Sequence, residues 1–200
     1  MTEKTKPGQS PRLVSRRAIA ALLGAALFLP AAFSPSLARA GEPDPARYIE
    51  RGTIRLAVDG KPQTLHVLAD KEDGIGGIYP GEDDKGRPLI FITGAAVDPK
   101  GARQRYPNAT LVLFIADDGT GRLVSANLYP GADDTLFYAD AAQKIGEIEL
   151  DSFEKSANGR LTGTASGVML DYRNGDGEVM IPVEGGKKHR FEARFTIQLP

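Results

Sequence analysis

The sequence has no cysteine and no tryptophan, and its 200 residues include only two histidines, His66 and His189. Without cysteine the chain forms no disulfide and performs no thiol chemistry. Two histidines are too few for a structural zinc site or for a catalytic zinc site built from three histidines. A metal bound here would therefore be a hard ion held by oxygen atoms, of which Ca²⁺ is the candidate.

Long apolar runs are also missing, since no segment reaches the ~20 apolar residues that cross a bilayer. The run from Ala18 to Phe33 is interrupted by Pro30, follows a basic segment and precedes the small-residue site Ala38-Arg39-Ala40. This three-part layout is typical of a secretory signal. We expect residues 1–40 to be a cleavable export signal and the chain to have no permanent membrane anchor.

The basic part of this segment contains "SRRAIA", Ser15 to Ala20, which resembles the twin-arginine export motif. Ala20 and Ala21 stand where that motif usually has a bulky apolar residue and a lysine, so general secretion is the alternative route. The resemblance implies that the twin-arginine or general secretion machinery is a partner. It also implies a periplasmic or secreted location in a bacterial cell envelope.

The charge balance changes once this segment is set aside. Residues 1–40 hold six of the 25 Lys and Arg residues and one of the 26 acidic residues, which leaves the remainder with a net charge near −6. Nucleic-acid binding needs clustered basic residues that contact phosphates. We therefore expect no nucleic-acid partner, and the same charge disfavours docking on anionic lipid.

Beyond an extended Pro-rich segment at 41–52, the apolar residues alternate with a period of two, which predicts strands with one buried face. Ile54, Leu56 and Val58 alternate in this way, as do the apolar residues of 191–199. Turn signals separate roughly nine to ten such segments, so residues 53–200 are predicted to form one all-β domain, a single antiparallel β-sandwich or barrel. Helix is expected only as single turns near 99–106 and 140–144.

One turn sequence occurs twice, as "IYPGEDD" at 78–84 and as "LYPGADD" at 128–134. Its paired aspartates can offer carboxylate oxygens to Ca²⁺, or they can hydrogen-bond the backbone of their own turn without an ion. The second interpretation is the simpler one, because adjacent side chains diverge. The candidate metal ligands are Asp83, Asp84, Asp133 and Asp134.

The same repeat supplies two candidate ligand-binding residues, Tyr79 and Tyr129, because sugar rings stack on exposed aromatic faces. The histidines offer no catalytic pattern: His66 is expected to face solvent, and His189 lies in a basic turn. Gly163, Ala165 and Gly167 are expected to mark a bend or a close approach of a neighbouring strand.

These features predict an exported, non-enzymatic module that binds an unknown small molecule or an envelope protein, with no cofactor except Ca²⁺ as a possible ion. Two alternatives stay open. One is a hydrolase of envelope glycans that uses two carboxylates, which sequence alone does not exclude because acidic residues are abundant. The other is a structural component of an envelope assembly, for which an exposed apolar patch or sheet edge would be the signature.

Overall fold

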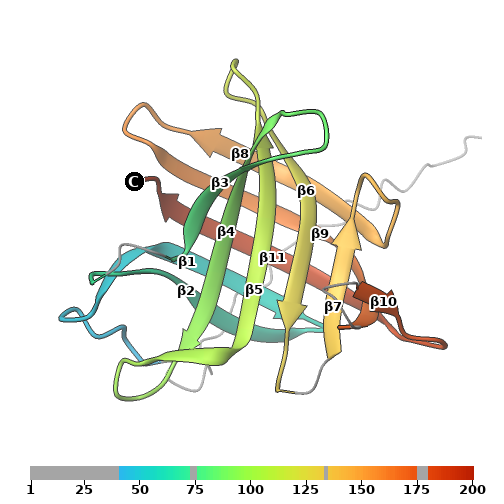
Figure 1. The fold of residues 1–200 in the computed structure, drawn as a ribbon, viewed down its shortest axis with the longest axis horizontal. Coiled ribbons are helices and arrows are strands. Elements are labelled where there is room, and N and C mark those ends of the chain that lie inside the picture. Colours follow the sequence, from blue (N-terminus) through green and yellow to red (C-terminus); the bar gives the residue numbers. More distant parts are fainter. Residues whose placement is uncertain (1–40, 73–75, 133–134, 175–179) are drawn as a thin grey trace, which may run out of the picture. The chain divides into compact units, whose positions relative to one another are not determined.

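The computed structural model describes residues 41–200 apart from 73–75, 133–134 and 175–179. This part of the chain consists of strands and turns (Figure 1). Within it, no helix is long and apolar enough to cross a membrane. The strands are β1 (Tyr48–Val58), β2 (Lys61–Asp70), β3 (Ile78–Glu82), β4 (Pro88–Val97), β5 (Arg103–Ile115), β6 (Gly121–Tyr129), β7 (Thr135–Asp140), β8 (Glu147–Lys155), β9 (Arg160–Asn174), β10 (Met180–Pro182) and β11 (Lys188–Gln198).

Eight of these strands form a closed antiparallel barrel in the order β9-β11-β1-β2-β4-β5-β6-β7, which closes where β7 pairs with β9. The other three are additions to its wall: β3 pairs with β4, while β8 and β10 pair with β9. Of the two architectures that the sequence leaves open, the structure is a barrel. The predicted all-β, antiparallel fold class is confirmed.

The alternation of the sequence sets the two faces of the wall. Ile54, Leu56, Leu65, Phe191 and Phe195 point inward and are at most 2% exposed. The residues between them face outward, as the buried-exposed alternation of β11 shows. An eight-stranded barrel is just wide enough for such side chains to fill its interior. The predicted inward face of β1 is confirmed.

The small residues of β9 permit the close approach that the sequence predicts. A Cβ atom at Gly163 would lie 2.5 Å from Cζ of Phe195, and one at Gly167 would lie 1.9 Å from the backbone oxygen of Glu147. Gly163 therefore leaves room for a core phenylalanine, while Gly167 lets β8 approach β9.

The first strand, β1, begins at Tyr48, within the segment 41–52 that the sequence predicts to be extended. Two predictions of helical turns are wrong. The segment near 99–106 contributes Arg103 onward to β5. Near 140–144 the chain makes a hydrogen-bonded turn instead of a helix. Asp140 organises this turn by accepting hydrogen bonds from the Tyr138 hydroxyl and from the N–H of Gln143, both at 2.8 Å.

Candidate functional site

The two copies of the repeated turn lie at opposite ends of the barrel. Residues 78–82 of the first copy form β3, and its aspartates begin the turn to β4, while the second copy starts with the last two residues of β6 and precedes β7 (Figure 1). Because β4 and β6 both pair antiparallel with β5, the start of β4 and the end of β6 lie at opposite ends of the wall. Asp83 and Asp84 therefore lie at the end of the wall opposite to the end of β6, where the second copy begins. Asp133 and Asp134 themselves lie outside the described residues.

In the first copy, Asp83 hydrogen-bonds its own turn. Its Oδ1 accepts the backbone N–H groups of Lys85 and Arg87, both at 2.9 Å, and its Oδ2 lies 2.6 Å from Nε and Nη2 of Arg87. These hydrogen bonds lower the pKa of Asp83 to about 2. A cation would have to displace the Arg87 guanidinium. This geometry favours turn chemistry over an ion site, while Ca²⁺ binding by Asp84, Asp133 or Asp134 stays a prediction.

Tyr79 and Tyr129 both lie on the outside of the wall formed by β3, β4, β5 and β6. Tyr79 is 38% exposed, and its hydroxyl donates a hydrogen bond to Oγ1 of Thr93 at 2.9 Å. The hydroxyls of Thr93 and Thr110 lie 2.8 Å apart, and the N–H of Thr110 donates to Oδ1 of Asn127 at 3.2 Å. A row of hydroxyl and amide groups thus crosses four strands.

The pairing register creates this row. Thr93 is directly opposite Thr110, and Thr110 is directly opposite Asn127. Side chains at directly opposed positions of antiparallel strands have Cβ atoms ~5 Å apart, within hydrogen-bonding reach. If Tyr79 donates to Thr93 and Thr93 donates to Thr110, the Thr110 hydroxyl keeps its own hydrogen for a further acceptor.

Two pairs of aromatic rings flank the row. The Tyr79 and Phe91 rings are stacked with centroids 6.3 Å apart, and the Tyr106 and Tyr129 rings lie 6.4 Å apart on the other side. Aromatic faces beside hydroxyl and amide groups are the usual elements of a surface that binds sugars or similar ligands. We call this surface the β3–β6 face; it consists of Tyr79, Phe91, Thr93, Tyr106, Thr110, Asn127 and Tyr129.

A second polar cluster lies at the end of the barrel where β11 begins. Nδ1 of His189 lies 2.7 Å from Oδ2 of Asp59, and its Nε2 lies 2.8 Å from Oδ1 of Asp171. The His189 ring also stacks on Phe137 with centroids 3.8 Å apart. The cluster therefore links the β1–β2 turn with β7, β9 and β11.

This geometry excludes two catalytic roles for the cluster as it stands. A general base needs a ring nitrogen that can accept a proton from a nucleophile, and both nitrogens of His189 are bound to carboxylates. Asp59 and Asp171 do face each other, yet the imidazole fills the space between them where a glycosidase would hold substrate. The hydrogen bonds of the cluster connect the β1–β2 turn to β9 and β11 at this end of the barrel. We call Asp59, Asp171 and His189 the latch.

Sequence reasoning missed this latch, because Asp59, Asp171 and His189 are far apart in the chain. It was also wrong about His66, whose side chain is only 11% exposed and whose Nδ1 lies 2.7 Å from Oε1 of Glu50. Period-two alternation correctly placed His66 on the outer face. It did not reveal that neighbouring side chains cover that position.

We expect the latch to make stability depend on pH. The hydrogen bond from His189 lowers the pKa of Asp59 below its ordinary value of 3.8. A carboxyl group with a lowered pKa stabilises the fold above its unfolded pKa, and this contribution is lost as the pH falls through the folded pKa. Replacing His189 by leucine should lower the urea midpoint at pH 7, because Asp59 and Asp171 then face each other without the imidazole that hydrogen-bonds both of them. The difference from wild type should shrink below pH 3.8.

His66→Leu is the matched control for this prediction. His66 contacts one carboxylate, and its Nε2 is buried without a hydrogen-bond partner among the described residues. Its replacement should cost less than that of His189. Equal urea midpoints for the two variants at pH 7 would contradict a latch role for His189.

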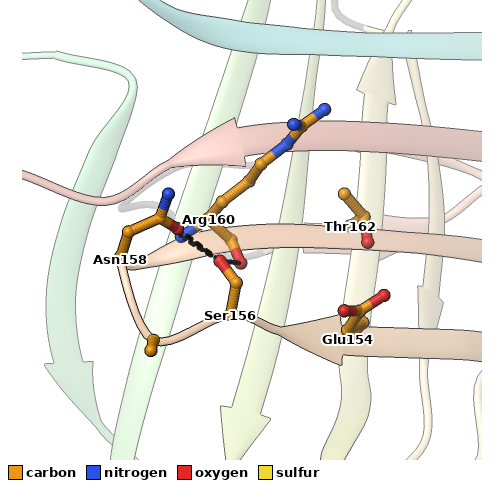
Figure 2. Close-up of a pocket in the computed structure, with 6 residues that line it drawn as sticks. Glu154, Ser156, Asn158, Arg160 and Thr162 are labelled. Atoms are coloured by element: carbon orange, nitrogen blue, oxygen red, sulfur yellow. Dashed lines mark hydrogen bonds between the residues drawn. The ribbon is translucent and has the colours of Figure 1, made fainter.

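An open hollow of about 530 Å³ lies at the β8–β9 hairpin (Figure 2). Its polar groups stabilise the turn itself, since the Ser156 hydroxyl and the Asn158 side chain bond to each other and the N–H of Arg160 donates to Ser156 Oγ at 3.1 Å. The Arg160 side chain extends away from them in Figure 2. One hairpin supplies the whole lining, namely Glu154, Ser156, Ala157, Asn158, Arg160 and Thr162.

Fold and surface together define an eight-stranded antiparallel barrel with a filled interior and an aromatic and hydroxyl-rich outer face. Comparison of the chain with family models yields no match, and none of the curated proteins or solved structures compared with it is similar. The functional argument therefore rests on geometry and chemistry.

Proposed function

We propose that the protein is an exported, non-enzymatic binding module whose ligand docks on the β3–β6 face. The observation that carries this proposal is the hydrogen-bonded row from Tyr79 through Thr93 and Thr110, with aromatic rings on both sides. Rings supply flat apolar contact, and the row supplies directional hydrogen bonds. The ligand that suits both is a hydroxyl-rich molecule such as a glycan.

Export is the part of the proposal that rests on sequence. The Ser15-to-Ala20 motif, the apolar run after it and the Ala38-Arg39-Ala40 site support transport to the periplasm or the medium by the twin-arginine or the general secretion machinery. A glycan-binding surface suits that destination, because the bacterial envelope is rich in polysaccharide.

A binding role is better supported than either alternative. The hydrolase would need two free carboxylates, and the facing pair Asp59 and Asp171 is bridged by His189. An assembly component would need a contiguous apolar surface or an uncovered sheet edge. The edge strand β8 is protected by the exposed charged side chains of Glu147, Glu149 and Glu154. Among the described residues, large apolar side chains are exposed only at scattered positions, namely Ile49, Tyr79, Ile181 and Val183.

The test is affinity electrophoresis of the full-length protein, expressed with its own N-terminal segment and recovered from the cell envelope. Native gels would contain dextran, hydroxyethylcellulose, carboxymethylcellulose or polygalacturonate. We expect at least one polysaccharide to retard the protein. The Thr93→Val/Thr110→Val variant should bind it about tenfold more weakly, because two hydrogen bonds of ~0.5–1.5 kcal/mol each are removed.

The control is Thr53→Val/Thr196→Val. Thr53 and Thr196 are also directly opposite each other, on β1 and β11, and these strands lie across the barrel from β5 and β6. This variant makes the same chemical change on the other wall and should bind like wild type. Equal weakening in both variants, or no retardation by any of the polysaccharides, would refute binding on the β3–β6 face.

A further inference from the structure

The wall that carries the β3–β6 face differs in charge from the rest of the domain. Strands β4, β5 and β6 contain no aspartate or glutamate, but they do contain Arg103, Arg105 and Arg122. Strand β8 alone contains Glu147, Glu149, Asp151 and Glu154. A chain whose net charge beyond residue 40 is near −6 thus has three neighbouring strands without acidic residues, and in β3 the one acidic residue is Glu82 at the end of the strand.

Acidic side chains return in the turns at the two ends of this wall, where Asp84 and Asp117 are exposed and Asp98 and Asp118 bond to their own loops. Asp98 accepts the N–H groups of Lys100 and Ala102, at 2.8 and 2.9 Å. Asp118 accepts the N–H and the hydroxyl of Thr120, at 2.9 and 2.7 Å. These two carboxylates are directed toward their own turns, and the charged side chains of β4, β5 and β6 themselves are all arginines.

Arginines lie beside the aromatic rings at both margins of the face. The guanidinium carbons of Arg87 and Arg122 lie 5.5 and 5.8 Å from the centre of the Phe114 ring. At the other margin the guanidinium of Arg105 lies 5.4 Å from the centre of the Tyr106 ring. Among the described residues, Arg122 takes part in no ion pair within 4 Å.

Stacking on a ring holds a guanidinium in place while its N–H groups stay available for a planar carboxylate. Arg122 on Phe114 and Arg105 on Tyr106 therefore present donors on both sides of the hydroxyl row. A ligand that matches the face carries negative charges separated by hydroxyl groups. A neutral glycan would leave these guanidinium groups without a partner.

We infer that the β3–β6 face binds an acidic glycan, a sugar chain that carries carboxylates. This inference rests on the proposed function and adds the class of ligand. Charge complementarity selects the anionic chain, while the aromatic pairs and the Thr93–Thr110–Asn127 row select sugar over a polymer that offers charge alone.

The experiment compares two polymers with the same backbone. The envelope-derived full-length protein is titrated with carboxymethylcellulose and with uncharged hydroxyethylcellulose. We expect at least tenfold tighter binding of the carboxylated polymer. This preference should largely disappear between about 0.1 and about 1 M NaCl, because the Debye length falls from ~10 to ~3 Å.

Arg122→Gln should weaken binding to carboxymethylcellulose at least fivefold and leave binding to hydroxyethylcellulose unchanged. Its control is Arg194→Gln, which removes an exposed arginine from the outer side of β11, the strand across the barrel from β5. We expect that variant to keep the wild-type preference.

Polyglutamate and phosphatidylglycerol vesicles complete the test, because they carry negative charge without sugar rings. Binding to either as tight as to carboxymethylcellulose would overturn the assignment to glycans. Suppose that the two cellulose derivatives bind equally and that the Thr93→Val/Thr110→Val variant binds both more weakly. That result would overturn the acidic preference but would agree with the proposed function. Binding to no polymer would refute both proposals.

Discussion

Replacing Phe195 by alanine should lower the free energy of unfolding by about 3–5 kcal/mol, the range for buried phenylalanines. Phe195 is 1% exposed inside the barrel, and its ring lies directly over Gly163. Glycine has no side chain that could move into the space left by the ring, so the cavity should persist. Urea denaturation should show a lower midpoint with an unchanged slope.

Arg194→Ala provides the comparison on the same strand. Arg194 is exposed on the outer face next to Phe195, and surface substitutions of this kind usually change stability by no more than about 0.5 kcal/mol. A loss for Phe195→Ala as small as that for Arg194→Ala would mean that Phe195 does not pack in the core.

Replacing Gly167 by alanine should be similarly damaging, with a loss of about 4 kcal/mol or more. The added methyl group would lie 1.9 Å from the backbone oxygen of Glu147 and 2.8 Å from its carbonyl carbon. Backbone atoms cannot rotate out of the way, so β8 would have to separate from β9. Hydrogen exchange should show loss of protection in β8 before the rest of the barrel.

Gly119→Ala is the control, because it measures the conformational cost of replacing a glycine without the steric clash expected at Gly167. Gly119 has a φ of 82°, and nothing lies within 4 Å of a Cβ atom built there. That substitution should cost only about 1–2 kcal/mol, the penalty for a left-handed backbone. If Gly167→Ala costs no more than this, then β8 does not approach β9 as closely as described.

Period-two alternation was sufficient to predict the fold class and most of the strands. It identified the inward residues of β1 and β11, because a strand with one solvent-exposed and one buried face has a clear alternation of polar and apolar residues. It missed β3 and β7, which are short and follow or precede the repeated turn: "IYPGE" contains proline and glycine, and both residues are depleted in strands. Pro80 is tolerated because β3 pairs on one side only, with β4.

The candidate site was predictable only in part. The position of tyrosines near strand ends pointed to Tyr79 and Tyr129, of which Tyr129 is half-buried, but Thr93, Thr110 and Asn127 carry no signal of their own in the sequence. They form a row only because the register of β4, β5 and β6 places them opposite one another. Register depends on the whole sheet, so a single sequence did not provide it.

The pairing of β1 with β11 also constrains when the barrel can form. Val58 in β1 is paired with Phe191 in β11, so the ring cannot close until the chain has been synthesised beyond residue 191. Contacts so distant in sequence slow folding and prolong the exposure of unpaired strands to aggregation. The two proposed export routes would therefore differ in the compartment where the barrel closes. A twin-arginine substrate would have to complete this slow closure in the cytoplasm, whereas a chain exported by general secretion would close its barrel only after translocation.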